Sequence, residues 1–246
     1  MDAPIWIKIC GTTNLPDAQL SVALGADALG FIFAPSKRRI DIATAAGITS
    51  DLPKHIETVG VFTEADKAEI IPAVQQAGLS AVQLHMAHDL TLTHCLHALL
   101  GPGVRLIQVI PFYTGTTDEE VIRESFEKPL SGALADPAVW AVLLDTAKDG
   151  RSGGLGETFS WRAALPAIRS AQERALEQRR GSLSGADQTP ELPKLLLAGG
   201  LQADNVPDAI GVLEPWGVDV VSGVEAGPGH KDPTRLAAFM AAARKR

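Results

Sequence analysis

Two titratable side chains in this sequence end apolar runs and are the first candidates for chemistry. Cys10 follows the strand-like run 5–9 and precedes Gly11, while Asp145 follows the apolar run 141–144. The pKa of a free thiol, about 8.5, leaves a usable thiolate fraction at neutral pH, and burial raises the pKa of a carboxyl. One group can then remove a proton while the other donates one, as an isomerisation requires. The plainer interpretations are an inert buried cysteine and an aspartate that caps a loop.

Cationic and polar side chains accompany these two. Lys8 has the same strand parity as Cys10, so its side chain is expected on the same face, one layer deeper. Arg38 lies in a basic loop, where it either clamps a carboxylate or phosphate or belongs to a solvated charge run. Gln83 and His85 alternate with an apolar residue on another strand. This alternation places both inside, as ligands or as satisfied core residues.

Glycines at two further strand ends predict a phosphate site. Gly199-Gly200 and Ser222-Gly223 each follow an apolar run. Glycine lets backbone N–H groups approach a ligand closely, and a following helix directs its positive end toward an anion. Tight turning between strand and helix is the alternative explanation, but two such loops together favour phosphate binding.

Eight alternations of strand and helix predict the elements that position these groups. The expected strands are 5–9, 27–33, 57–62, 80–85, 104–110, 139–144, 195–198 and 218–221, and the expected helices begin near residues 14, 41, 63, 88, 118, 160, 203 and 232. This pattern matches a closed (β/α)8 barrel, the α/β fold also called a TIM barrel, with a doubly wound open sheet as the rival. In such a barrel Cys10 and Asp145, three strands apart at the carboxyl ends, face one another.

One domain is expected for residues 1–246, with surface insertions near 114–137 and 170–193. Within the first insertion a helix is predicted only for 118–127. Residues 174–190 are charged and then rich in glycine and serine, which indicates an extended surface helix and a mobile loop. A glycine-rich loop is expected at 150–156, after the sixth strand.

The bulk composition excludes several classes of function. A net charge of −7 disfavours nucleic acid and anionic membranes as partners, because both bind basic surfaces. The amino terminus has no signal-peptide pattern, and no window approaches about eighteen unbroken apolar residues. Two cysteines without zinc-like spacing indicate neither a disulfide scaffold nor a metal site. The expected compartment is therefore the cytoplasm, and no metal is expected.

Nine segments together resemble the phosphoribosylanthranilate isomerase family of tryptophan biosynthesis. They are 8–13, 25–31, 36–40, 82–85, 143–146, 156–161, 198–201, 217–225 and 228–232. The resemblance covers nearly the whole chain and keeps the order of the segments. It implies the barrel fold, a phosphosugar substrate and no cofactor.

The resemblance also implies an Amadori rearrangement of N-(5-phosphoribosyl)anthranilate to 1-(2-carboxyphenylamino)-1-deoxyribulose 5-phosphate. By analogy Asp145 is the general acid at the furanose ring oxygen, Cys10 is the general base at C2′, and Arg38 holds the anthranilate end. The other expected contacts are Lys8, Gln83, His85 and Asp219 for the substrate, and Gly199, Gly200, Ser222 and Gly223 for its phosphate.

Two positions depart from the family pattern. Val221 stands where a second serine is usual, and Glu157 stands where a lysine is usual. Two other functions stay open: a related sugar-phosphate barrel acting on another aminoaldose or on two substrates, and a non-catalytic sensor of phosphate ligands. The expected assembly is a monomer or a homodimer.

Overall fold

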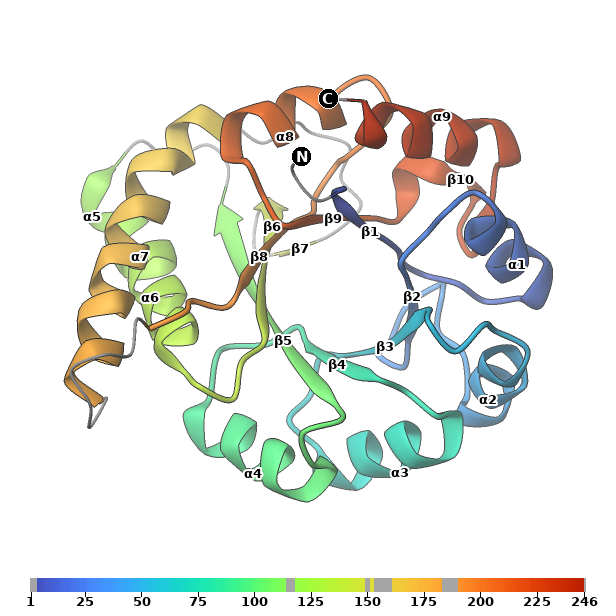
Figure 1. The fold of residues 1–246 in the computed structure, drawn as a ribbon, viewed down its shortest axis with the longest axis horizontal. Helices are drawn as coiled ribbons and strands as arrows, with labels where there is room; N and C mark the ends of the chain where they lie inside the picture. Colours follow the sequence, from blue (N-terminus) through green and yellow to red (C-terminus); the bar gives the residue numbers. More distant parts are fainter. Residues whose placement is uncertain (1–3, 114–117, 149–150, 153–160, 183–189, 246) are drawn as a thin grey trace.

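A ring of parallel strands surrounded by helices forms the body of the molecule (Figure 1). The computed structural model describes residues 4–113, 118–148, 151–152, 161–182 and 190–245. The ring consists of β1 (Trp6–Ile9), β2 (Ala28–Ile32), β3 (Glu57–Phe62), β4 (Ala81–Leu84), β5 (Arg105–Tyr113), β6 (Ala141–Lys148), β8 (Lys194–Leu197) and β9 (Gly217–Val220). Pairing of β5 with β6 and of β1 with β9 closes the ring. The predicted (β/α)8 barrel is confirmed, and the open sheet is excluded.

Helices follow the strands and cover the outside of the ring. They are α1 (Leu15–Ala23), α2 (Ile42–Ser50), α3 (Lys67–Ala77), α4 (Leu90–Leu100), α5 (Glu119–Ile122), α6 (Lys128–Ala135), α7 (Trp161–Ser182), α8 (Val206–Leu213) and α9 (Pro233–Arg244), with a π turn η1 (Arg123–Glu127) and a 3-10 turn η2 (Ser222–Val224). Short antiparallel strands are β7 (Arg151–Ser152) beside β6, and β10 (Glu225–Gly227) paired with β11 (His230–Lys231). No helix in the described ranges has the length and apolarity needed to cross a bilayer.

Side-chain oxygens cap the helices that begin beside the strand ends. Asn14 accepts from the Asp17 N–H at 2.9 Å, and Asp41 accepts from the Thr44 N–H at 2.7 Å. Such bonds satisfy backbone donors that have no partner within the first turn. The helix starts predicted near residues 14 and 41 are confirmed.

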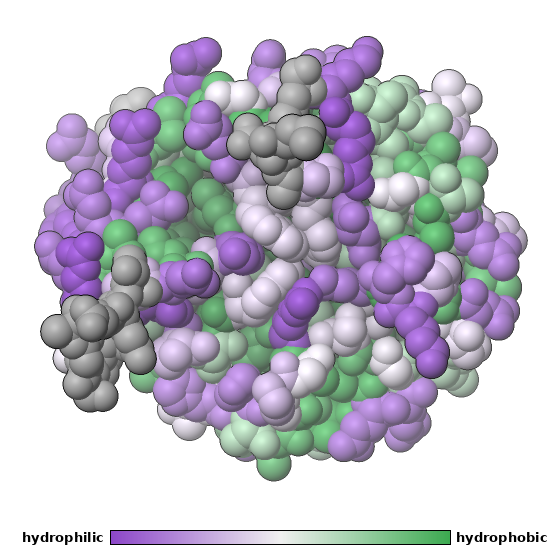
Figure 2. Space-filling model, viewed as in Figure 1, coloured by the Kyte–Doolittle hydropathy of each residue, from purple (hydrophilic) through white to green (hydrophobic). Residues whose placement is uncertain are grey.

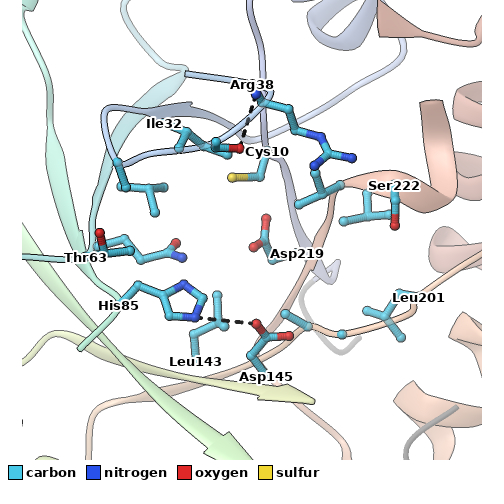
Figure 3. A pocket seen from close by; sticks show the side chains of 18 of the residues that line it. Cys10, Ile32, Arg38, Thr63, His85, Leu143, Asp145, Leu201, Asp219 and Ser222 are labelled. Atoms are coloured by element: carbon cyan, nitrogen blue, oxygen red, sulfur yellow. Dashed lines mark hydrogen bonds and ion pairs between the residues drawn. The ribbon is translucent and has the colours of Figure 1, made fainter. Parts of the chain in front are cut away.

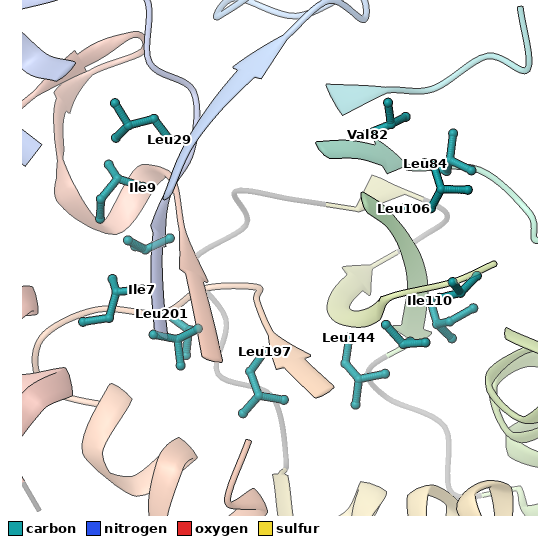
Figure 4. Close-up of a cluster of buried hydrophobic side chains, with 14 of the residues drawn as sticks. Ile7, Ile9, Leu29, Val82, Leu84, Leu106, Ile110, Leu144, Leu197 and Leu201 are labelled. Atoms are coloured by element: carbon teal, nitrogen blue, oxygen red, sulfur yellow. The ribbon is translucent and has the colours of Figure 1, made fainter. Parts of the chain in front are cut away.

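Alternation along each strand divides the apolar residues into two cores. Ile7 and Ile9 of β1 face outward toward the helices, as do Leu144 of β6 and Leu197 of β8 (Figure 4). The intervening residues face inward, among them Trp6 and Leu143, and form the smaller core inside the ring. Because successive side chains on a strand point to opposite faces, Lys8 and Cys10 follow Trp6 into the ring.

Three element boundaries differ from the sequence prediction. β6 does not end at Leu144, because its ladder with β5 continues through Pro111 opposite Asp145 to Tyr113 opposite Ala147. The helix expected to end at Glu127 continues through η1 and α6 to Ala135. β7 lies within the stretch 150–156, where only a loop was expected.

Candidate active site

A cavity of about 390 Å³ opens at the carboxyl ends of the ring strands (Figure 3). Cys10 enters it from β1 and Asp145 from β6, on opposite sides, with the carboxylate of Asp219 between them. Around the ring β9 and β8 separate β1 from β6. The two titratable groups therefore reach one space from strands three steps apart.

The thiol of Cys10 is buried, with 3% of the residue exposed. Its backbone N–H donates to the Val220 carbonyl at 2.9 Å, which extends the pairing of β1 with β9 by one residue. Burial raises the pKa of this thiol, and the nearby charge of Lys8 opposes the rise without cancelling it. The thiolate fraction is therefore smaller than that of the free thiol considered from the sequence, because desolvation outweighs the adjacent charge.

Lys8 lies below Cys10 inside the ring, fully buried and paired with Asp219. Its Nζ donates to Asp219 Oδ1 at 2.9 Å. Burial alone would lower the pKa of Lys8, but the charges of Asp219 and Cys10 and hydrogen bonds to both raise it. Lys8 is therefore an ammonium at neutral pH, and it joins Cys10 and Asp219 in one polar cluster.

His85 accompanies Asp145 on the opposite side of the cavity. Its Nε2 lies 3.8 Å from Asp145 Oδ2, and the contact is drawn in Figure 3. Burial lowers the pKa of His85, and the positive charge of Lys8 lowers it further, against the opposing effect of Asp219. A neutral imidazole beside the Asp145 carboxyl can donate or accept a hydrogen bond without adding a charge.

Arg38 lines the cavity from the loop after β2 and is bound by Glu225. Its Nε donates to Glu225 Oε1 at 2.8 Å, and its Nη2 donates to Oε2 at 2.6 Å. The hydrogen bond to Glu225 raises the pKa of Arg38, so the guanidinium keeps its charge. This two-pronged geometry fixes the plane of the guanidinium at the edge of the cavity.

Glycines bring the backbone to the cavity between β8 and β9. Gly199 and Gly200 have φ angles of 88° and 63°, which favour glycine. A Cβ on Gly223 would lie 2.0 Å from the Leu201 carbonyl oxygen, so only glycine fits there. Both loops, together with Ser222, line the cavity. Their exposed N–H groups can bind an anion of the size of phosphate.

Ten of the eleven residues predicted from the sequence line this one cavity, and Lys8 lies beneath it. The ten are Cys10, Arg38, Gln83, His85, Asp145, Gly199, Gly200, Asp219, Ser222 and Gly223. Val221, the departure from the family pattern, also lines it, while Glu157 lies outside the described residues. The buried Oε1 of Gln83 has no hydrogen-bond partner among the described residues, so it can accept a bond from a ligand.

Sequence reasoning missed Glu225 and Lys231 as members of the site. Both stand in segments that carried the family resemblance, but neither received a role. The available signal was a pair of opposite charges flanking the Gly227-Pro228-Gly229 turn. Among the described residues, no group of three or more His, Cys, Asp or Glu is placed to hold a metal ion.

The fold and the cavity lining define a (β/α)8 barrel enzyme whose titratable side chains stand at the carboxyl ends of the strands. The sequence model of the family described as N-(5'phosphoribosyl)anthranilate (PRA) isomerase matches residues 7–242. The chain belongs to this family.

Relatives named N-(5'-phosphoribosyl)anthranilate isomerase match almost end to end. The protein from Symbiobacterium thermophilum is 38% identical over 242 residues, 98% of each chain. The protein from Chlorobaculum tepidum is 38% identical over 240 residues, 97% of this chain and 95% of that protein.

Solved structures of phosphoribosylanthranilate isomerases have the same fold. That from Thermotoga maritima superposes with a TM-score of 0.75 and 34% identity, covering 97% of this chain and 98% of that one. Another, in complex with reduced 1-(o-carboxyphenylamino)-1-deoxyribulose 5-phosphate, has a TM-score of 0.72 and 32% identity over 97% of this chain and 98% of that one.

Proposed function

We propose that this protein converts N-(5-phosphoribosyl)anthranilate to 1-(2-carboxyphenylamino)-1-deoxyribulose 5-phosphate, the isomerisation expected of its family. The observation that carries the proposal is the approach of Cys10 and Asp145 to one cavity from opposite sides (Figure 3). Relatives that match 96% to 98% of this chain are named for this activity. Membership of the family thus supplies the substrate, and the cavity supplies a proton donor and a proton acceptor.

The proposed reaction starts at Asp145. Its carboxyl protonates the furanose ring oxygen, which opens the ring to an iminium, and the neutral imidazole of His85 orients that carboxyl. Cys10 then removes the C2′ proton, and the enolamine tautomerises to the ketone. Because the iminium makes the C2′ proton acidic, the minor fraction of Cys10 that has lost its proton to solvent, held beside the Lys8 ammonium, suffices as the base.

The two anionic ends of the substrate are proposed to bind two different sets of groups in the cavity. The phosphate binds the backbone at Gly199, Gly200 and Gly223, with Ser222 as a side-chain donor. The anthranilate carboxylate binds Arg38. Holding both ends fixes the ribose between Cys10 and Asp145, which supplies part of the rate through orientation.

The decisive experiment measures turnover of freshly prepared phosphoribosylanthranilate by loss of anthranilate fluorescence. Asp145→Asn and Cys10→Ser are each expected to lower kcat by about 10²–10⁴-fold, the usual contribution of an acid–base group. Asp208→Asn on the exposed face of α8 and Cys95→Ser on α4 are matched controls and are expected to keep wild-type kcat. Retention of more than about a tenth of kcat by either site variant contradicts its assigned role.

We further propose a cytoplasmic protein that is a monomer or a homodimer. Both cysteines are free thiols, as is usual in a reducing compartment. A structural relative from Thermotoga maritima is described as dimeric, which supports the homodimer. Light scattering across a concentration series distinguishes the two assemblies.

A further inference from the structure

A buried ion pair stands in the hairpin that follows the phosphate-side loop. Glu225 begins β10 and lies opposite Lys231 of β11 in the antiparallel register. Each residue is only 5% exposed, and Lys231 Nζ lies 3.3 Å from Glu225 Oε1. The free-energy cost of removing two charges from water can exceed the gain from their mutual attraction. An apolar pair of similar volume is often as stable. The hairpin alone therefore does not explain the pair.

Glu225 binds Arg38, which lines the cavity. The Glu225 carboxylate accepts hydrogen bonds from Nε and Nη2 of that guanidinium. Its Oε1 also accepts a hydrogen bond from the Gly229 N–H at 3.2 Å. These bonds occupy one edge of the guanidinium and leave Nη1 for the cavity that Arg38 lines. Burial would raise the pKa of Glu225, but the hydrogen bond from Arg38 and the charge of Lys231 lower it, so the group is a carboxylate.

Lys231 contacts Cys10 as well as Glu225. Its Nζ donates to the backbone carbonyl of Cys10 at 2.6 Å, and its backbone N–H donates to Asp17 Oδ2 at 2.8 Å. The Lys231 ammonium thus binds both Glu225 and the backbone of Cys10. Because Glu225 also binds Arg38, a continuous set of contacts connects Cys10 with the guanidinium of Arg38.

We propose that Glu225 and Lys231 are positioning residues that hold Arg38 and Cys10 in one frame. In one bound position of the substrate, its carboxylate then contacts Arg38 and its C2′ proton lies next to Cys10. This inference rests on the proposed function, which assigns Arg38 and Cys10 their roles. Neither Glu225 nor Lys231 needs to touch the substrate.

The charge of Lys231 gives the frame an electrostatic effect on the thiol as well. The groups that act on Cys10 are the ammonium of Lys8, the carboxylate of Asp219, the ammonium of Lys231 and, more weakly, the guanidinium of Arg38. Burial dominates and raises the pKa of Cys10, while Lys8 and Lys231 lower it. Removal of Lys231 is therefore expected to raise that pKa further.

The first test is Glu225→Gln, which keeps the shape of the side chain and removes its charge. Because Arg38 loses a two-pronged charged acceptor, KM for phosphoribosylanthranilate is expected to rise about ten- to a hundredfold, with a smaller change in kcat. An unchanged KM overturns the Arg38 half of the proposal.

The second test is Lys231→Met, in which the Cys10 carbonyl and Glu225 both lose their donor. Small displacements of a reacting group cost about 10²-fold, so kcat is expected to fall by about that factor. Lys231→Gln, polar but uncharged, separates the hydrogen bond from the charge and serves if the Met variant does not fold. It is expected to recover part of kcat while the Cys10 pKa stays raised. Values of kcat within about twofold of wild type in both variants overturn the Cys10 half.

A readout without substrate separates this proposal from the proposed function. The pKa of Cys10 is measured by ultraviolet absorbance of the thiolate in a Cys95→Ser background, and Lys231→Met is expected to raise it. Asp232→Ala is the matched control, because it removes the cap of α9 beside the hairpin and leaves both charges in place. If Lys231→Met raises the Cys10 pKa but the wild-type protein does not turn over phosphoribosylanthranilate, the positioning role of Lys231 stands and the isomerase activity is rejected. Turnover with an unshifted pKa, or the same shift in Asp232→Ala, rejects the frame.

Discussion

The space occupied by the Cys10 sulfur depends on a glycine of the neighbouring strand. A Cβ added to Gly30 of β2 would lie 2.5 Å from Cys10 Sγ and 3.0 Å from Lys8 Cε. No real Cβ approaches a neighbour so closely, and the atoms around both groups are buried. The sulfur can therefore occupy this position only because residue 30 has no side chain.

Gly30→Ala is expected to displace the thiol while the binding groups stay in place. We expect kcat to fall about 10²-fold, because a reacting group moves by about an ångström. KM is expected to change much less. Steady-state kinetics with a thermal unfolding curve checks this, since overpacking also costs about 1–3 kcal/mol of stability.

Gly47→Ala is the control for that substitution. Gly47 lies on the exposed face of α2, where an added Cβ meets nothing within 4 Å. Alanine there is expected to stabilise the protein by about 0.5–1 kcal/mol without changing kcat. A wild-type kcat in Gly30→Ala would show that the sulfur has room to move without loss of function.

The pH dependence of the reaction is set by the resting thiol. Burial raises the pKa of Cys10, so at neutral pH most of the enzyme carries the protonated form. A general base acts only after losing its proton, and in Asp145→Asn the acid no longer titrates. The residual kcat/KM of that variant is therefore expected to rise with pH, about tenfold per unit, until the raised pKa of Cys10 is reached. A pH–rate profile of Asp145→Asn checks the rise, and a flat profile from pH 7 upward in that variant contradicts Cys10 as the base.

Residue types, strand parity and the family resemblance together predicted which side chains share the cavity, but not their charge state. Lys8 and Cys10 were expected on one face of β1, and they are in contact. The balance between burial and the Lys8 charge depends on Asp219, which arrives from a strand more than 200 positions later in the chain. Such a balance is a property of the folded interior and has no local signal in the sequence.

At the scale of elements, buried apolar positions extend the helical run after β5 beyond its sequence prediction. The helix was expected to end at Glu127, and Pro129 follows two positions later, where proline lacks a backbone donor and disfavours the helical conformation of its predecessor. Instead the π turn η1 precedes it, and α6 continues with Leu130 and Leu134 fully buried. Tertiary packing of this face outweighs the local signal.

A buried carboxylate between α6 and β6 binds side chains on α4 and just before it. Asp136 follows α6 and accepts hydrogen bonds from His88 Nε2 at 3.0 Å, His94 Nε2 at 3.1 Å and Thr93 Oγ1 at 2.5 Å, as well as from the Ala138 N–H. Burial would raise the pKa of Asp136, but these hydrogen bonds and the charge of His88 lower it to about 2. His94 and Thr93 of α4, with His88 just before it, thus fasten α4 to the segment between α6 and β6.

Asp136→Asn is expected to destabilise the fold by about 1–3 kcal/mol at neutral pH, because buried donors lose a charged acceptor. A folded-state pKa of about 2, below the ordinary 3.8, means that the carboxylate stabilises the protein above about pH 4 and loses this effect as pH falls toward 2. The difference in unfolding free energy between wild type and variant is therefore expected to shrink in that interval. Urea unfolding at several pH values measures it, with Asp51→Asn on the surface as control. An equal loss at every pH contradicts the ionic contribution.

At the scale of the whole molecule, alternation of short apolar runs and helical segments predicted the closed barrel. Each strand buries both faces, one against the helices and one inside the ring, so the runs are nearly continuous in apolar residues. Hydrophilic side chains are prominent around the periphery of the face shown in Figure 2. The ends of β5 and β6 were harder to predict, because Pro111 and Asp145 continue a ladder that only the partner strand reveals.

The last helix, α9, reaches the start of the first strand (Figure 1). Arg244, the last residue of α9, donates from Nη1 to the Ile5 carbonyl at 2.5 Å and from Nη2 to Gly25 and Asp27 Oδ2 at 2.9 Å each. Asp27 Oδ2 in turn accepts the Ile7 N–H at 2.8 Å. The last helix thus holds the first strand against the second.

Arg244→Ala is expected to weaken this closure without reaching the cavity. The side chain is partly exposed, and its bonds to a carboxylate and to carbonyls predict a loss of about 1–2 kcal/mol. That loss corresponds to a Tm about 2–8 °C lower for a domain of this size, with an unchanged urea m value. Because Arg244 lies at the opposite end of β1 from Cys10, kcat measured well below Tm is expected to stay at the wild-type value. Lys245→Ala, one position further on and exposed, is the control and should leave Tm unchanged. A fall in kcat with an unchanged Tm would instead mean that closure at the termini sets the geometry of the thiol at the far end of the strand.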